Sequence, residues 1–407
     1  MSKIQPYTLS VPDEDIARLK AKLEITRLPN ELEGAEWLYG SPLTDIKRLV
    51  ERWKDGYDWR KHETELNDAL PQFTVDIEVD GFETLNIHFV HQKSTLETAI
   101  PLLFVHGWPG SFLEVKKILP LLTAVSSDHP SFHVVALSLP NFGFSEGTKK
   151  KGFAIDQYAE VAHKLMLTLG YNQYVTQGGD WGHVITKAMA TSYGTKHVKA
   201  WHTNMPVVGP PKPLSSPLLF LQHLVKPYSA AEKTGLERAI WFRQKGRGYF
   251  AEQATQPQTL GYSLADSPAG LLAWIYEKLV TWTDSYPWTD DDVLTWVSIY
   301  WFSRAGPAAS VRIYYEASQS FNRLDTYVPN VPMGISVFPK DLGVVPRSWM
   351  YAIGKVVFMS EHENGGHFAA YEKPDELVRD LHKFLGKGGP AHGVVDGNNG
   401  YSLSSRL

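Results

Sequence analysis

The spacing of apolar residues in the first 95 positions predicts helices followed by a pair of strands. Helical stretches cover residues 42–53 and 58–69, and a proline with three acids at 11–15 marks an earlier helix start. Residues 73–79 and 83–91 alternate between apolar and polar around Asp80-Gly81, which is typical of a hairpin. We therefore expect residues 1–95 to form an N-terminal arm.

Beyond residue 95 the pattern changes to short apolar runs separated by helical stretches. The runs are 101–105, 132–137 and 174–177, and the helical stretches are 112–122, 155–169 and 182–193. Strands that alternate with helices along the chain form parallel sheets covered by helices on both faces. The predicted fold class is α/β, with a mostly parallel, doubly covered sheet whose first half spans residues 96–206.

After residue 206 the strand pattern fades for more than a hundred residues. Proline-rich joints are followed by helical stretches such as 267–282 and 290–303. We expect residues 207–326 to form a helical cap that lies over the sheet.

The sheet pattern returns in the last part of the chain. Apolar runs at 334–338 and 355–359 are followed by a closing helix at 374–385, so the second half of the core is placed at 327–386. Residues 387–407 are rich in glycine, asparagine and serine. This composition predicts a disordered tail.

Composition restricts the class of function. The chain has 407 residues, of which 43% are hydrophobic and 21% charged, as in an ordinary soluble globular protein. A net charge of −4 gives no basic surface for nucleic acid or an anionic membrane, and no apolar stretch is long enough to cross a bilayer, so we expect a cytoplasmic protein without such partners. The absence of cysteine excludes disulfides, thiolate metal sites and thiol catalysis. The 13 tryptophans fit either aromatic core packing or an aromatic-lined pocket.

A variant nucleophile motif lies in the middle of the chain. Its residues are Gly178-Gly179-Asp180-Trp181-Gly182, the G-x-S-x-G elbow with aspartate in place of serine. The motif falls between a predicted strand and a predicted helix, which is the context that the elbow requires. A serine there attacks an acyl carbon, whereas a carboxylate displaces a leaving group from a saturated carbon and then holds an alkyl ester that water must cleave. Asp180 is therefore the candidate nucleophile.

A carboxylate nucleophile needs a base that activates water for the second step, and His367 is the candidate. It lies in a glycine-rich loop after the last predicted strand, at the edge where active sites of open α/β sheets form. The base needs a carboxylate partner on its other ring nitrogen. Asp341 directly follows the preceding strand. It is preferred over Glu361 and Glu363, which share the loop of His367 and would have to reach back under the imidazole.

Two backbone N–H groups are expected to stabilise the oxyanion of ester hydrolysis. One belongs to Trp181, the residue after the nucleophile. The other belongs to Trp108, in the segment His106-Gly107-Trp108-Pro109-Gly110 after the first core strand. The alternative is that this segment is only a tight turn.

The sequence contains no complete motif for binding a metal ion or a nucleotide. His362 and His367 are five positions apart with Gly365 and Gly366 between them, so they do not share a helical face as H-E-x-x-H requires. Residues 143–147 are not followed by the G-K-[ST] of a phosphate loop, and a dinucleotide fingerprint is absent. We expect neither a metal nor a cofactor.

Three motifs occur together in a fixed order along the chain. They are H-G-W-P-G at 106–110, G-G-D-W-G at 178–182 and G-G-H-F-A-A at 365–370. As a set they resemble the α/β-hydrolase-fold epoxide hydrolases, most closely the microsomal type with its N-terminal arm and in particular its soluble fungal members. The resemblance spans nearly the whole chain. It implies hydrolysis of an epoxide to a vicinal diol through an ester on Asp180, with His367 and Asp341 activating the water.

The same resemblance implies two cap tyrosines that hydrogen-bond the epoxide oxygen and protonate it as the ring opens. The family pattern selects Tyr249 and Tyr314, and Tyr315 is the neighbour with which Tyr314 could be confused. The resemblance also implies an apolar or aromatic epoxide as substrate and a homodimer as the assembly. Vertebrate microsomal members carry a membrane anchor and usually a glutamate as the triad acid, whereas here we expect no such anchor and Asp341 as the acid, as in the fungal branch.

Three other functions are weighed against this one. A haloalkane dehalogenase uses the same elbow aspartate, and Trp181 is compatible with halide binding, but paired cap tyrosines and a long N-terminal arm are not expected there. A serine-type esterase does not fit an elbow that carries Asp180. A non-catalytic small-molecule binder on this fold would be marked by the loss of a catalytic residue, and none is lost.

Overall fold

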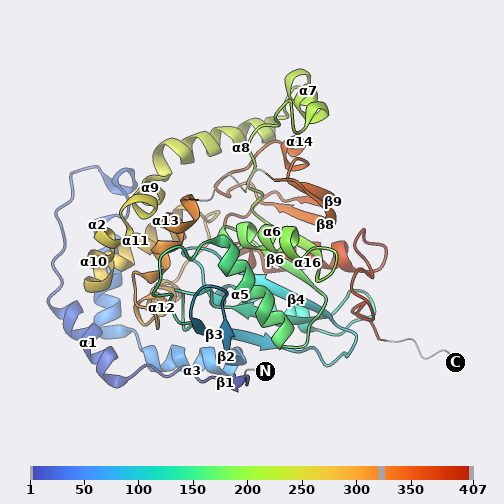
Figure 1. Ribbon diagram of the computed structural model, residues 1–407. Helices are drawn as coiled ribbons and strands as arrows, with labels where there is room; N and C mark the ends of the chain where they lie inside the picture. The colour runs from blue at the N-terminus through green and yellow to red at the C-terminus, as the bar shows by residue number, and fades with distance from the viewer. Residues whose placement is uncertain (1–2, 320–325, 403–407) are drawn as a thin grey trace.

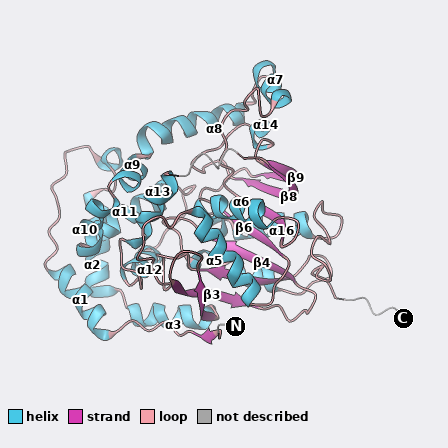
Figure 2. Ribbon diagram, viewed as in Figure 1, coloured by secondary structure: helices cyan, strands magenta, loops and turns pink. Residues whose placement is uncertain are grey.

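The computed structural model describes residues 3–319 and 326–402. Within these ranges nine strands form one sheet in the order β1-β2-β3-β5-β4-β6-β7-β8-β9, with helices packed around it (Figures 1 and 2). The pairs β1–β2, β2–β3 and β3–β5 are antiparallel. The other neighbouring strands pair in parallel. The strands are β1 (Gln5–Pro6), β2 (Gln72–Glu78), β3 (Thr84–Gln92), β4 (Ile100–Val105), β5 (Phe132–Leu137), β6 (Tyr174–Gly178), β7 (Val198–Thr203), β8 (Val328–Val337) and β9 (Gly354–Glu361).

The central strands have the continuous burial that their sequences predict. Every residue of β4, β5 and β6 is buried, because helices cover both faces of the sheet at this point. The helices of this part are α4 (Leu119–Thr123), α5 (Ile155–Thr168), α6 (Trp181–Tyr193), α14 (Arg347–Met350), α15 (Ala369–Glu372) and α16 (Pro374–Leu385). Helix α5 packs against α6, and α4 packs against α16. The predicted α/β class with a mostly parallel sheet is confirmed.

The predicted hairpin at the start of the sheet is also confirmed. Strands β2 and β3 pair from Glu78 opposite Thr84 to Gln72 opposite Val90. Gly81, in the connection, has a φ of 79°, a left-handed conformation that glycine adopts without a steric penalty.

Strand β7 is missing from the sequence-based prediction, which found no strand between residues 178 and 207. Its sequence places Lys199 and His202 among apolar residues, so it does not read as an apolar run. His202 is nevertheless fully buried, and its Nε2 lies 3.1 Å from the hydroxyl of Ser336 on the neighbouring strand β8. A buried polar side chain with a hydrogen-bond partner is compatible with a core strand.

Seven α-helices of the described chain lie between β7 and β8 in the sequence and over one end of the sheet (Figure 1). They are α7 (Pro217–Val225), α8 (Ala230–Trp241), α9 (Gly248–Thr255), α10 (Pro257–Asp266), α11 (Pro268–Thr281), α12 (Asp290–Trp301) and α13 (Arg312–Ser318). These helices fall in the region expected to form the cap, and residues 320–325 of that region lie outside the described residues.

The first three helices, α1 (Asp13–Glu24), α2 (Leu43–Glu51) and α3 (Trp59–Ala69), pack against cap helices. Arg52 forms two hydrogen bonds of 2.9 and 3.0 Å with the carboxylate of Asp291. The hydroxyl of Tyr57 lies 3.0 Å from that of Thr295, and both side chains are buried. The N-terminal arm thus contacts the cap at α12.

The C-terminal segment differs from the disorder expected for residues 387–407. Residues 387–402 pack against the body of the protein, and Ala391, Val395 and Tyr401 are buried. The Thr98 hydroxyl donates a hydrogen bond of 2.6 Å to the carbonyl of Tyr401. Four glycines of this segment have positive φ and form turns, so a composition that suggested disorder instead supplies tight turns. Residues 403–407 lie outside the described residues.

Candidate active site

Asp180 lies in the turn between β6 and α6, where the sequence predicts it. Its φ of 52° and ψ of −129° are strained for a residue with a side chain. The flanking glycines make the turn possible, since a Cβ on Gly178 would lie 2.6 Å from the carbonyl of Gly182, and one on Gly182 would lie 1.9 Å from the carbonyl oxygen of Val105. The strained turn projects the carboxylate above the end of the sheet.

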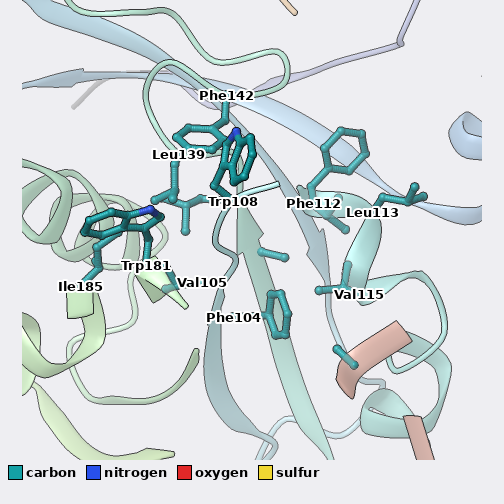
Figure 3. Close-up of a cluster of buried hydrophobic side chains, with 14 of the residues drawn as sticks. Phe104, Val105, Trp108, Phe112, Leu113, Val115, Leu139, Phe142, Trp181 and Ile185 are labelled. Atoms are coloured by element: carbon teal, nitrogen blue, oxygen red, sulfur yellow. The ribbon is translucent and has the colours of Figure 1, made fainter. Parts of the chain in front are cut away.

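The carboxylate of Asp180 is held by backbone donors. The N–H of Trp108 donates a hydrogen bond of 2.8 Å to Oδ1, and the N–H of Trp181 is a second donor. A Cβ on Gly107 would lie 2.2 Å from Oδ1, so only glycine allows this approach. Figure 3 shows the two tryptophan side chains near the carboxyl end of β4 at Val105. The segment 106–110 is therefore more than a tight turn.

His367 lies in the loop after β9 and contacts two carboxylates. Its Nε2 is 3.6 Å from Oδ2 of Asp180, and its Nδ1 is 2.7 Å from Oδ1 of Asp341. Asp341 follows β8, and its Oδ1 also accepts the N–H of Leu342 at 2.7 Å. The structure thus brings Asp180, His367 and Asp341 together in one line of contacts.

The two rival carboxylates lie away from this line. Glu361 and Glu363 are exposed, and Glu361 lies 3.6 Å from the guanidinium of Arg347. Asp341 is buried. The geometry favours Asp341 as the partner of His367.

Burial and charge act in opposite directions on the two central groups. Burial raises the pKa of Asp180, against the lowering effect of His367 and of the two backbone donors. Burial by itself would lower the pKa of His367, but the charge and hydrogen bond of Asp341, followed by the charge of Asp180, raise it above its ordinary value. The imidazolium form of His367 is therefore favoured by its neighbours.

The two predicted tyrosines lie on different cap helices and face the same space. Tyr249 on α9 and Tyr314 on α13 are buried, with ring centroids 5.9 Å apart. Tyr249 stacks on Trp108 at 5.3 Å, and Tyr314 meets Trp181 edge-on at 4.9 Å.

Burial and the charge of Asp180 raise the pKa of Tyr249 well above 10. Burial and the nearby Tyr249 and Asp180 do the same for Tyr314. Tyr315, by contrast, is 42% exposed and does not line the cavity. Of the two neighbouring tyrosines, Tyr314 and not Tyr315 lies at the cavity.

A cavity of about 260 Å³ lies between the cap and Asp180. Its lining is mostly apolar and includes Val184, Met205, Phe242, Phe250, Leu342 and Val345, together with Trp181 and both tyrosines. Such a space suits a small apolar molecule whose one polar atom meets the two hydroxyl groups. Part of the aromatic content therefore lines a pocket.

Two residues outside the predicted motifs also support the site. The carbonyl of Trp282 accepts the N–H of His367 at 2.8 Å, and its ring meets the imidazole edge-on at 5.0 Å. The guanidinium of Arg238 donates a hydrogen bond of 2.9 Å to the backbone carbonyl of Asp341. Both residues belong to the cap, and no motif in the sequence connects them to the core.

The described residues contain neither a membrane-spanning helix nor a cluster of metal ligands. None of the helices in the described ranges has the length and apolar character needed to pass through a bilayer. Among the same residues, no group of three or more His, Asp or Glu side chains gathers as a metal site would require.

Comparison with known proteins identifies two family regions. Residues 4–115 match the family "Epoxide hydrolase N terminus", and residues 100–232 match the family "alpha/beta hydrolase fold". The chain is 39% identical to a putative epoxide hydrolase of Stigmatella aurantiaca over 391 residues, which cover 93% of this chain and 84% of the relative. It is 34% identical to epoxide hydrolase 1 of Sus scrofa, with 94% and 88% covered.

Solved structures agree with these relatives. The epoxide hydrolase of Aspergillus niger superimposes with a TM-score of 0.81 at 36% identity, covering 93% of this chain and 95% of that one. The juvenile hormone epoxide hydrolase of Bombyx mori gives a TM-score of 0.84 at 32% identity, covering 94% and 93%. The chain therefore belongs to the microsomal-type epoxide hydrolases, enzymes with the α/β-hydrolase fold.

Proposed function

We propose that this epoxide hydrolase opens an apolar or aromatic epoxide in two steps, through a covalent ester on Asp180. The observation that carries the proposal is the position of the Asp180 carboxylate. It lies at the cavity, with one oxygen bound by the N–H of Trp108 and the other 3.6 Å from His367. A two-step displacement requires a nucleophile next to the substrate and a base next to the nucleophile.

In the first step a carboxylate oxygen of Asp180 attacks one ring carbon of the epoxide. The new C–O bond forms as the ring C–O bond breaks, and the released alkoxide takes a proton from Tyr249 or Tyr314. Their raised pKa keeps both hydroxyls protonated at neutral pH before the reaction. Because the charge of Asp180 is one cause of that rise, its loss in the ester makes the tyrosines better acids as the alkoxide forms.

In the second step His367 removes a proton from water, and the water oxygen attacks the carbonyl carbon of the Asp180 ester. The N–H groups of Trp108 and Trp181 stabilise the negative oxygen of the tetrahedral intermediate. Collapse of the intermediate releases the diol, whose leaving oxygen takes the proton from His367. The proton left on the regenerated carboxyl of Asp180 returns to the tyrosinate.

The variant His367→Gln tests this scheme. It should still form the ester but hydrolyse it very slowly, because no base remains to activate water. Intact-protein mass spectrometry after incubation with a styrene-oxide-type substrate should show a mass increase equal to that of the substrate. The wild-type protein, quenched after complete turnover, is the control and should show no adduct. An unmodified variant that also makes no diol would contradict the assignment of His367.

A dehalogenase reaction is the nearest alternative because it also uses an elbow aspartate. The two tyrosines that line the cavity favour the epoxide, since an alkoxide needs a proton as it leaves and a halide does not. Release of bromide or chloride from a haloalkane would support the alternative. The cytoplasmic location and the homodimer expected from the sequence stay predictions.

A further inference from the structure

The two-step scheme leaves one buried carboxyl group beside the site without a role. Glu114 lies in the short 3-10 helix η3 (Phe112–Lys116), and only 9% of its surface is exposed. A Cβ on Gly110 would lie 1.8 Å from its Oε1, so the glycine leaves the room that the carboxyl occupies. Gly107 does the same for Asp180. One loop, residues 106–110, therefore accommodates two carboxyl groups.

A second cavity, of about 10 Å³, lies between these two groups and His367. Its polar lining consists of the side chains of Glu114, Asp180, Asn204 and His367. This volume fits about one water molecule, and the lining offers several hydrogen-bond partners.

Among the described residues, Asp180 alone lines both this small cavity and the apolar cavity of about 260 Å³. The nucleophile thus separates an apolar side, which suits the epoxide, from a small polar side. Water for the second step has to approach the carbonyl carbon of Asp180 while the alkyl group still occupies the apolar side. The small cavity, which Asp180 and His367 both line, offers space for this water.

The charge of Glu114 depends on the state of Asp180. Burial and, to a smaller extent, the charge of Asp180 raise the pKa of Glu114 to about 8, against the lowering effect of His367. Once Asp180 is esterified its charge is gone, so the carboxylate form of Glu114 becomes easier to reach. The negative charge of Glu114 raises the pKa of His367, and it therefore favours the imidazolium that forms in the second step. After burial, the charge of Glu114 is the next cause that raises the pKa of Tyr300.

We propose that Glu114 holds the reacting water of ester hydrolysis in the small cavity. The water donates one hydrogen bond to the carboxyl of Glu114 and gives its other proton to Nε2 of His367. Its oxygen then forms the bond to the carbonyl carbon of Asp180. Glu114 gains and loses no proton in this step, so its part is to orient the water. The inference rests on the proposed ester mechanism.

A purely structural role makes a different prediction. In that case the carboxyl of Glu114 would serve only to accept the N–H of Ser111 at the start of η3. Its removal would loosen the loop that also carries Trp108, and ring opening and ester hydrolysis would both be slowed.

Two variants distinguish these roles. Glu114→Met removes the hydrogen-bonding oxygens at similar size, and Glu114→Gln keeps one acceptor oxygen. In single turnovers with excess enzyme, Glu114→Met should slow ester hydrolysis by about a hundredfold and Glu114→Gln by about tenfold, since hydrogen bonds to charged groups have this effect. Ring opening should stay within about twofold of the wild type, so the ester accumulates and is seen by intact-protein mass.

Hydrolysis at the wild-type rate in both variants would overturn the inference. So would an equal loss in both steps together with a lower unfolding temperature, since that pattern belongs to the structural role. His367→Gln is measured alongside. If it traps an ester while Glu114→Met does not, only the role of Glu114 fails. If neither variant nor the wild type ever forms an ester, the proposed function itself fails.

Discussion

At the scale of single residues, the motifs predict the candidate site because each meets a local requirement of the backbone. Gly178 and Gly182 permit the strained turn at Asp180, and Gly107 permits the approach of the loop. Such requirements can be read from the sequence. Glu114 could not be found in this way, because it is one of 44 acidic residues and nothing in its neighbourhood marks it as buried. Only the fold brings it beside His367.

The tyrosine pair gives a prediction at this scale. Tyr249→Phe and Tyr314→Phe should each slow ring opening by about tenfold to a hundredfold, because each removes one proton donor to the leaving oxygen. Hydrolysis of the ester should be unaffected. Rapid-mixing kinetics of tryptophan fluorescence can separate the two steps, since Trp108 and Trp181 contact the tyrosines.

Tyr315→Phe is the matched control for this experiment. Its side chain is 42% exposed and does not line the cavity, so both steps should run at the wild-type rate. A loss in Tyr315→Phe as large as that in Tyr314→Phe would reverse the assignment.

At the scale of elements, the sequence predicted most of the sheet but not all of it. Apolar runs identified β4, β5 and β6 because these strands are buried on both faces. The apolar pattern fails at β7, where Lys199 and His202 interrupt it. The hydrogen-bond partner of the buried His202 side chain, Ser336, is 134 positions away in the sequence. Long-range hydrogen bonds of this kind leave no periodic signal in the sequence.

The turn between β6 and α6 yields a second prediction. Gly182→Ala should lower the free energy of unfolding by about 3 kcal/mol, because its Cβ would meet a backbone oxygen at 1.9 Å that cannot move aside. Gly209→Ala is the control, since a Cβ there meets nothing within 4 Å. Denaturant titration measures both variants. Equal midpoints for the two would show that the turn is not held as tightly as the structure indicates.

At the scale of the whole molecule, the N-terminal arm and the cap are joined by contacts that no local pattern indicates. The ion pair of Arg52 with Asp291 links residues 239 positions apart. The sequence predicted an arm and a cap separately, and nothing in it indicated that α1 and α2 pack against α11, or α3 against α12 (Figure 1).

Buried histidines give a prediction for the stability of the whole protein. Burial lowers the pKa of His88 and His183 to about 3 and that of His106 and His202 to about 4. In the unfolded chain a histidine has a pKa of about 6.5, so the unfolded state binds more protons below that pH. The stabilising effect of these histidines is complete above pH of about 6.5 and is lost as the pH falls toward 4. Glu114, whose pKa is raised to about 8, opposes this trend, as do Asp180 and His367, whose pKa values are also raised.

The unfolding temperature should therefore fall between pH 7 and pH 5. Scanning calorimetry across that range provides the measurement. His88→Gln should make the dependence on pH less steep, whereas replacement of the exposed His392 by glutamine should leave it unchanged. A flat profile for the wild type would contradict the neutral state inferred for the buried histidines.

The central claim is that the epoxide is attacked by Asp180 and not by water. It is tested most directly by a single turnover in ¹⁸O-labelled water with enzyme in excess over substrate. The first diol released should carry no label, because its new oxygen comes from the carboxylate of Asp180, and the label should appear in the protein. A diol that carries the label from the first turnover would mean direct attack by water and would contradict the covalent mechanism.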